Sequence, residues 1–390
     1  MGKHDRVASS QTKDSSKKTM TKTCDILIIG DPHIKSDKPD FYKKYIERMV
    51  YIAKTRKPHA VVLLGDIFDK HHTTDNTAFR LIYKLIDQLS KIAPTFVIVG
   101  NHDYIDSNQF LTKKHFLGPL KKWHNVTVVD YPTYISLKDK TFVLCPYVPP
   151  GRFTEALDKL VNEGHCWDIV DAIFAHQEFY GCMYKPFPST TGDVWDEDYP
   201  PVFSGHIHPE QILGNVYYPG SSIQHSFAEP PNKKVWIVSF GDFADQQFKI
   251  DKISVGLKGK KLLYLDLDEI EEFDMELLED YDVKIALKCD THEYAAFCAS
   301  KTYKILRSRS VIITHSPGSS TGNSKGSSVD AKYDKCVHTI SKLSFGEILK
   351  GIVSTKSDAV QREFDELFGD MELMSETEHN PKAKILFETE

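Results

Sequence analysis

The sequence predicts an α/β fold, a four-layer α/β/β/α sandwich with a small α+β capping domain and a helical C-terminal element. Three observations predict it. Short apolar runs alternate with segments of helical periodicity through the first hundred residues, and strand-like segments then follow one another with few helices between them. A stretch rich in serine and glycine, 316–328, then separates the last compact segment from the C-terminal remainder.

The first sheet is predicted from apolar runs that each end in glycine. These runs are DILIIG (25–30), AVVLLG (60–65) and TFVIVG (95–100). Residues 40–57 and 76–92 lie between them and have apolar positions at helical spacing. Strands that are apolar throughout are typical of a sheet covered on both faces, so we expect both faces of this sheet to be buried.

A second sheet is predicted from the segments that follow residue 124. The predicted strands are 125–130, 140–147, 171–176, 200–208, 216–221 and 233–240. Because few helices separate them, we expect these strands to form a sheet that packs on the first one. Residues 246–255 are predicted to be a closing strand, and we place the whole first domain at 24–255.

The rest of the chain divides by composition. Residues 256–315 carry a β-β-α-β pattern and are predicted to form the capping domain. Residues 316–335 are predicted to be a flexible linker, because nine of the thirteen residues at 316–328 are serine or glycine. Residues 336–390 contain amphipathic segments and are predicted to be helical. Residues 1–23 are polar and rich in lysine and serine, which predicts a disordered basic tail.

Composition argues against several classes of protein. The seven cysteines are odd in number and form no CxxC pair, which favours a reducing intracellular compartment over a disulfide framework. No apolar run reaches the length of a membrane helix and the N-terminus has no apolar signal core, so we expect an intracellular protein without a membrane partner. The net charge of −6 argues against non-specific coating of nucleic acid, but a DNA enzyme with a locally positive cleft remains compatible with it.

Five short fragments concentrate acids, histidines and amides at the ends of predicted strands. They are Asp31-Pro32-His33, Gly65 to Asp69, Gly100 to Asp103, the single His176, and Gly205 to His208. Sites in open α/β sheets form beyond the carboxyl ends of the strands, so all five fragments can converge there. In four cases a glycine directly precedes the acid, amide or histidine, which lets the backbone turn sharply and approach a metal or phosphate.

The residue types in these fragments suit a two-metal centre. Asp31 and His33 are two positions apart, as are His206 and His208, so each pair projects from one side of an extended segment. Carboxylates can bridge two cations, and imidazole suits manganese, iron and zinc. Two such ions about 3.5–4 Å apart clamp a phosphate and lower the pKa of a bound water for attack on phosphorus. The candidate ligands are Asp31, His33, Asp66, Asn101, His176, His206 and His208.

Together the fragments resemble the signature of the calcineurin-like metallophosphoesterases, which reads D-x-H, G-D-x-x-D, G-N-H-D/E, a single H and G-H-x-H. The resemblance implies two metal-ligand sets that share a bridging Asp66. They are Asp31, His33, Asp66 and His208 for one metal, and Asp66, Asn101, His176 and His206 for the other. It also implies that His102 is a catalytic histidine outside both metals, which assists the leaving oxygen. Asp69 matches the acid that orients this histidine, with His71 or His72 as alternatives.

A finer resemblance rests on the residues around the motifs. GDIFDKHHTT (65–74) differs from the GDxVDRG form of protein phosphatases, and FSGHIHPEQILGNVYYPGSSIQHSFAE (203–229) resembles the SbcD-type nucleases of double-strand-break repair. This resemblance implies a manganese-dependent DNA exo- or endonuclease, with iron or zinc as alternative metals. It also implies an SbcC-type coiled-coil ABC ATPase as partner of residues 336–390, and a homodimer through helices near 76–92 and 107–122. The departures from cellular patterns suit a viral or phage source.

Two other functions stay open at this level. The first is a metallophosphoesterase that acts on a small phosphodiester or a phosphoprotein, which a direct assay separates from a nuclease. The second is a DNA-repair scaffold whose catalysis is dispensable. Degenerate members of the family are expected to lose ligands, whereas all seven candidate ligands and His102 are present here, which favours an active enzyme.

Overall fold

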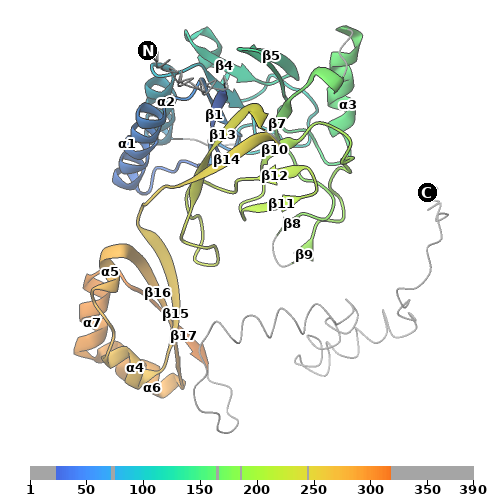
Figure 1. Ribbon diagram of the computed structural model, residues 1–390. Coiled ribbons are helices and arrows are strands. Elements are labelled where there is room, and N and C mark those ends of the chain that lie inside the picture. The colour runs from blue at the N-terminus through green and yellow to red at the C-terminus, as the bar shows by residue number, and fades with distance from the viewer. Residues whose placement is uncertain (1–22, 72–74, 164–166, 185–186, 244–245, 318–390) are drawn as a thin grey trace, which may run out of the picture. The chain divides into compact units, whose positions relative to one another are not determined.

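The computed structural model describes residues 23–71, 75–163, 167–184, 187–243 and 246–317 (Figure 1). Its strands are β1 (Cys24–Ile29), β2 (Ala60–Leu63), β3 (Thr95–Ile98), β4 (Val126–Val129), β5 (Thr133–Leu137), β6 (Lys140–Leu144), β7 (Ala172–His176), β8 (Met183–Tyr184), β9 (Phe187–Pro188), β10 (Val202–Gly205), β11 (Gln211–Leu213), β12 (Val216–Tyr218), β13 (Lys234–Phe243), β14 (Gln246–Ser254), β15 (Gly259–Leu265), β16 (Tyr281–Cys289) and β17 (Ile312–Pro317). Its α-helices are α1 (Pro39–Arg56), α2 (Asn76–Ser90), α3 (Phe153–Leu157), α4 (Leu267–Glu271), α5 (Leu277–Asp280), α6 (Thr291–Ala299) and α7 (Lys301–Ser308). Short 3-10 helices span Gly118–Lys122, Asp158–Glu163 and Trp167–Ile169.

The first sheet has the strand order β14-β13-β1-β2-β3-β4. Strands β1 to β4 run parallel, whereas β13 and β14 add antiparallel strands at one edge. Helices α1 and α2 cover one face, because their buried residues and one face of β1 and β2 form a single apolar cluster (Figure 1). Helix α2 begins where the Asp75 carboxylate accepts hydrogen bonds from the N–H groups of Thr77 and Ala78.

The second sheet has the strand order β11-β12-β10-β7-β6-β5. An apolar layer fills the space between the sheets, where Phe142, Phe174 and Phe203 meet Trp236 and Phe240 of the first sheet. The other face of the second sheet packs against α3 and the neighbouring 3-10 helices. The layers are therefore helix, sheet, sheet and helix, which confirms the predicted α/β/β/α sandwich. The predicted place of strands 125–130 and 233–240 in the second sheet is wrong, because these strands pair with β3 and β1 as β4 and β13 of the first sheet.

Segment 107–122 is not the α-helix that its sequence suggests. Only Gly118–Lys122 is helical, as a 3-10 turn with a proline at its start. The main-chain N–H of Ile105 donates to Lys114 and that of Phe116 donates to Asp103, and these bonds hold the preceding residues in turns. Such bonds replace the i to i−4 bonds of an α-helix. Strand β5 is also absent from the sequence-based expectations, because its side chains are only half-buried and give a weak apolar pattern.

Residues 259–317 form a smaller α/β unit with an apolar core of its own. Three parallel strands in the order β15-β16-β17 pack with α4 to α7 around residues such as Ile285 and Leu287. The single helix of the predicted β-β-α-β pattern is two helices, because Ser300 ends α6 and its hydroxyl caps α7. The short helices α4 and α5, between β15 and β16, are not part of that predicted pattern. Strand β14 ends at residue 254 and β15 begins at residue 259, so the predicted boundary at 256 falls in the connection between them.

Several predicted segments lie outside the described residues. They are the basic tail, apart from residue 23, the linker beyond residue 317, and the helical C-terminal element at 336–390. In the part of the chain that the structure describes, no helix is both long enough and apolar enough to cross a membrane. The five cysteines in that part, at positions 24, 145, 182, 289 and 298, are free.

We expect Phe174→Ala to lower the free energy of unfolding of the sandwich by about 3–5 kcal/mol, because a fully buried ring in the layer between the sheets would be replaced by a cavity. Urea unfolding followed by circular dichroism measures the change. Tyr51→Ala is the control, since this ring on α1 is 60% exposed and its loss should shift stability by less than about 0.5 kcal/mol. Equal losses in the two variants would contradict the packing described.

Candidate metal centre

The five predicted fragments lie at the ends of strands that face one region of the sandwich. The fragments follow β1, β2 and β3, which are neighbours in the first sheet, and β7 and β10, which are neighbours in the second. Strands β1 to β3 are parallel and β7 is parallel to β10, so their carboxyl ends lie together within each sheet. A contact between Asp66 of the first sheet and His176 of the second joins the two sets.

One group of candidate ligands joins Asp66 and Asn101 to two histidines of the second sheet. The His176 Nε2 atom lies 3.4 Å from Asp66 Oδ1 and 3.0 Å from Asn101 Oδ1. The His206 Nδ1 atom lies 2.8 Å from the same Asn101 oxygen. The Leu64 carbonyl oxygen lies 2.7 Å from His176 Nδ1 and thereby directs Nε2 of that ring towards the group. The four side chains predicted for one metal therefore lie together.

The other group joins His33 and His208 to the second oxygen of Asp66. The His33 Nε2 atom lies 3.4 Å from Asp66 Oδ2 and 3.3 Å from His208 Nε2. Asp31 is fully buried, and its Oδ1 accepts a hydrogen bond of 2.8 Å from the main-chain N–H of His206. The two carboxylate oxygens of Asp66 thus face different groups, which is the arrangement that a bridging carboxylate requires.

The side chains present fit divalent ions. The buried atoms Asp31 Oδ2 and His33 Nδ1 have no hydrogen-bond partner, although buried polar atoms are normally paired. Imidazole, carboxylate and amide groups together accept manganese, iron or zinc, so the donor set is compatible with each of these metals. Among the described residues, three triads bring their ligand atoms within 4.8 Å of one another: His33/Asp66/His102, Asp66/His176/His206 and His33/His208/His225.

The backbone is strained at the candidate ligands themselves. The φ angles are 37° at Asp31, 36° at His33 and 48° at Asp66, and His206 has a φ of 77°. Residues other than glycine seldom adopt a positive φ, and such strain is typical of functional sites. Among the glycines that precede the ligands, Gly65 has a positive φ, 105°, so most of the sharp turning occurs at the ligands.

The glycines act mainly by leaving room for neighbouring loops. A Cβ atom on Gly65 would lie 2.5 Å from His176 Nδ1, and a Cβ atom on Gly100 would lie 2.3 Å from the Asp66 nitrogen. Both distances are well inside van der Waals contact, so these loops can approach each other only because glycine has no side chain. The structure shows a close approach of these loops to one another.

The two buried aspartates have opposite pKa shifts. Burial raises the pKa of Asp31, and His176 and His208 offset this rise only in part. Burial acts in the same direction on Asp66, but His176 and His33 outweigh it and hold the pKa of Asp66 well below its usual value. Against the effect of burial, Asp66 raises the pKa of His176 to about 9. Asp66 is therefore the carboxylate kept ionised between the two groups of histidines.

The predicted catalytic residue His102 projects beside the candidate ligands. Its Nδ1 atom lies 2.8 Å from the main-chain carbonyl oxygen of Asp69. The Asp69 carboxylate instead pairs with Lys35 Nζ at 2.9 Å, so the support for His102 comes from the carbonyl of Asp69 and not from the predicted carboxylate. The ring of His71, one predicted alternative, stacks on His102 with a centroid distance of 4.3 Å. The other alternative, His72, lies outside the described residues.

Asp103 is a buried residue to which the sequence alone assigned no role. Its carboxylate accepts three main-chain hydrogen bonds of 2.9 Å, from Ile67, Phe68 and Gly100. It therefore ties the loop after β2 to the loop after β3, and each of these loops carries a candidate ligand. The signal was its place directly after His102 in the GNHD fragment.

Two glutamates that the motifs do not include support ligand histidines. The Glu229 Oε1 atom lies 3.4 Å from His208 Nδ1, and its Oε2 pairs with Lys233 Nζ at 2.8 Å. The Glu178 Oε2 atom lies 3.7 Å from His206 Nε2. A carboxylate beside a ligand histidine is a common arrangement in metal sites. The sequence carries no local signal for it, because Glu229 and His208 are 21 positions apart.

We expect Glu229→Gln to weaken metal binding about 10- to 100-fold, because a neutral amide orients the His208 ring less firmly than a carboxylate does. Titration calorimetry with manganese measures the dissociation constant. Glu210→Gln is the matched control, since Glu210 pairs with Lys234 and Lys252 and should bind metal like the parent. An unchanged dissociation constant in Glu229→Gln would contradict its supporting role.

Comparison with known proteins identifies the family. The family model of the calcineurin-like phosphoesterases matches residues 25–210. Protein 244L of Invertebrate iridescent virus 6, which is named as a phosphoesterase, is 38% identical over 281 residues, 71% of this chain and 98% of that protein. Protein 078R of Invertebrate iridescent virus 3, likewise named, is 36% identical over 284 residues, 72% of this chain and 81% of that protein. A UDP-2,3-diacylglucosamine hydrolase of Shewanella halifaxensis is 29% identical over 111 residues, 28% of this chain and 45% of that protein. The chain therefore belongs to the calcineurin-like metallophosphoesterases, a family of hydrolases that use divalent metal ions.

Proposed function

We propose that this metal-dependent phosphoesterase is a DNA nuclease that hydrolyses phosphodiester bonds in double-strand-break repair and recombination. It would act as the nuclease subunit of a complex with an SbcC-type ATPase. The observation that carries the proposal is the stretch 203–229, whose sequence resembles the SbcD-type nucleases. We call the part of this stretch at residues 216–229, after the last metal motif, the wall segment.

The wall segment packs directly against the candidate ligands. The main-chain N–H of Ser222 donates to the Gly30 carbonyl at 2.7 Å, and the Ser222 hydroxyl pairs with the Tyr45 hydroxyl at 2.8 Å. The Nε2 atom of His225 lies 2.9 Å from the main-chain oxygen of Asp31. The part of the sequence that resembles the nuclease branch is thus placed where it can influence which substrate reaches the ligands.

The chain's own residues provide orientation and proton transfer. Two divalent ions bound at the ligands would neutralise phosphate charge and lower the pKa of the attacking water. Asp66, kept ionised, holds the two histidine groups on either side of it. Because His102 Nδ1 is engaged by the Asp69 carbonyl, Nε2 is the ring atom left to exchange a proton, and the imidazolium form would donate that proton to the leaving oxygen.

The proposed complex involves further surfaces. Residues 336–390 are the predicted docking region for the ATPase, and they lie outside the described residues. The predicted homodimer would use α2, because segment 107–122 is not the second α-helix that the prediction required. DNA is the proposed substrate, and manganese is the proposed ion, with iron and zinc as alternatives.

A small phosphodiester is the second candidate substrate, because one partial relative is named as a UDP-2,3-diacylglucosamine hydrolase. One assay separates the two candidates. The purified full chain would be incubated with manganese and end-labelled linear DNA, duplex or single-stranded, with and without an SbcC-type ATPase. Bis(4-nitrophenyl) phosphate would be assayed in parallel as a generic diester. We expect DNA cleavage that EDTA abolishes and manganese restores. Hydrolysis of the generic diester with intact DNA in every arm would refute the nuclease proposal.

We expect His102→Asn to slow DNA hydrolysis by about 10²- to 10⁴-fold, because the imidazole is proposed to supply a proton and not to bind metal. Its metal content, measured by elemental analysis, should equal that of the parent. Asp66→Ala provides the contrast, since it removes the oxygens that face both histidine groups and should lose metal and activity together. Loss of metal from His102→Asn would show that the assigned role is wrong.

A further inference from the structure

A small cavity lined by lysines lies against the metal site. This lysine pocket has a volume of about 220 Å³. Lys35 and Lys38, from the connection between β1 and α1, line one side of it. Lys258, from the connection between β14 and β15, and Lys260, from β15, line it as well. The pocket therefore gathers positive charge from segments far apart in the sequence.

The lysine pocket is positive although the whole chain has a net charge of −6. Its four lysines are accompanied by two acids, Asp37 and Asp282, so four positive minus two negative charges leave a net +2. Lys35 also pairs with the carboxylate of Asp69 outside the lining, and counting that carboxylate leaves a net +1. Asp282 pairs with two of the lysines, Lys38 at 2.8 Å and Lys258 at 3.4 Å. A cavity with a surplus of ammonium groups suits an anionic ligand.

Lys260 is held in place at the edge of the lysine pocket. Its Nζ donates to the His225 carbonyl at 2.6 Å, and its main-chain N–H and carbonyl bond to the Gln224 side chain at 2.5 and 2.9 Å. Partial burial and the nearby charges of Lys38 and Lys35 lower the pKa of Lys260, which is consistent with ammonium groups directed into one space. His225 occupies one of the three N–H donors of this ammonium group, which leaves two for a ligand.

The lysine pocket shares a wall with the metal site. His225 lines the pocket, and its Nε2 lies 2.9 Å from the Asp31 carbonyl. Lys35 also lines the pocket, and it pairs with the carboxylate of Asp69, whose carbonyl contacts His102. An anion in the pocket would therefore lie next to a phosphate held at the candidate ligands.

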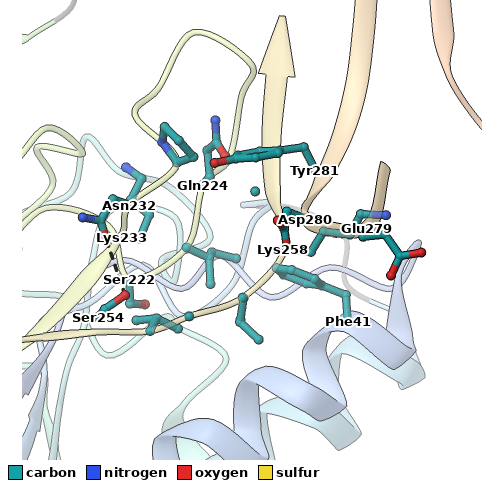
Figure 2. Close-up of a pocket in the computed structure, with 16 residues that line it drawn as sticks. Phe41, Ser222, Gln224, Asn232, Lys233, Ser254, Lys258, Glu279, Asp280 and Tyr281 are labelled. Atoms are coloured by element: carbon teal, nitrogen blue, oxygen red, sulfur yellow. Dashed lines mark hydrogen bonds between the residues drawn. The ribbon is translucent and has the colours of Figure 1, made fainter. Parts of the chain in front are cut away.

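A larger cavity of about 530 Å³ adjoins the lysine pocket and shares Gln224 and Lys258 with it (Figure 2). Its lining has two positively charged and two negatively charged side chains, so these charges cancel. They are Lys233, Lys258, Glu279 and Asp280. Lys233 is moreover paired with Glu229. Of these two cavities, the lysine pocket is the one suited to an anion.

We propose that the lysine pocket binds a second phosphate of the substrate, the one that adjoins the scissile phosphodiester in a nucleic-acid strand. The inference rests on the proposed nuclease function and names what the enzyme recognises, a run of phosphates and not an isolated diester. Ammonium groups bind phosphate oxygens through charge-assisted hydrogen bonds and do not read bases. The pocket therefore selects substrates by the spacing of their phosphates along the strand and not by their bases.

The test removes the flanking charge from the substrate. Thymidine trinucleotides would carry one phosphodiester and one neutral methylphosphonate linkage, in either order, and would be compared with the strand that has two phosphodiesters. For the parent protein, kcat/KM should fall about tenfold when the linkage beside the scissile one is neutral, which is the loss of one charge-assisted contact. Lys260→Met should lose about tenfold on the strand with two phosphodiesters and little more on the methylphosphonate strand, because both changes remove the same contact.

Lys261→Met is the matched control. Lys261 neighbours Lys260 along β15 but points to the opposite face, where its Nζ lies over the Tyr281 ring. This variant should respond to the methylphosphonate as the parent does.

Lys38→Met is a second variant of the pocket that leaves β15 intact. Lys38 precedes α1 without capping it through its side chain, so the helix should be preserved, and the same loss of sensitivity to the methylphosphonate is expected.

Binding without turnover gives a readout that does not depend on the chemistry. In EDTA, the fluorescence anisotropy of a labelled single strand reports the binding constant as salt is varied. The slope of log K against log salt should be shallower by roughly 0.7 in Lys260→Met, which corresponds to one phosphate contact. Equal slopes and equal methylphosphonate sensitivity in the parent and in Lys260→Met would overturn the proposal.

Deoxythymidine triphosphate is the comparison for the source of the second phosphate. If Lys260→Met affects hydrolysis or binding of the triphosphate alone, the pocket belongs to a nucleotide and the assignment to a strand is overturned. The proposed function fails separately, when the parent hydrolyses bis(4-nitrophenyl) phosphate but cleaves no strand. In that event the test of the pocket is the slope of log K against log salt alone. Equal slopes for the parent and for Lys260→Met would overturn the proposal that the pocket binds a phosphate.

Discussion

One carboxylate oxygen of Asp66 faces His176 from the second sheet while the other faces His33 from the first. This arrangement requires the two sheets to pack against each other in one defined position. The aromatic layer between them, which includes Phe174 and Trp236, fixes that position because close-packed interiors tolerate little displacement. The packing of the sandwich and the geometry of the metal site are therefore one constraint.

Around Asp66 the chain accepts strain to bring ligands close together. Positive φ angles at residues other than glycine cost of order 1–3 kcal/mol each and persist only where the surroundings dictate the conformation. Here the surroundings do so through Asp103, which binds the N–H groups of two loops, and through Gly65 and Gly100, which leave no room for a side chain. The loops that carry Asp66 and Asn101 are thus held together by hydrogen bonds and close packing of the chain itself.

In the proposed function, substrate recognition falls to segments outside the metal motifs. The wall segment contacts the main chain of Asp31 through His225, and the side chain of Gln224 bonds to the main chain of Lys260 in the smaller α/β unit. The smaller unit therefore reaches the metal site through the wall segment. The metal motifs and the segments proposed to recognise the substrate are therefore joined by hydrogen bonds.

The sequence by itself determined the sandwich and the candidate ligands, because both are encoded in short stretches. Apolar runs mark the strands, and the acids, amides and histidines directly after them are the side chains that the structure brings together. Prediction was wrong where other main-chain hydrogen bonds replace those of a helix, as around segment 107–122, and where strand pairing decides the sheet, as for β4 and β13. Only the tertiary structure decided that the carbonyl of Asp69 contacts His102 and that Glu229 supports His208. It also decided that Lys260 lines one pocket with the lysines of the connection between β1 and α1. Each of these contacts depends on how the sheets and the smaller unit pack, and no local pattern of residues records that packing.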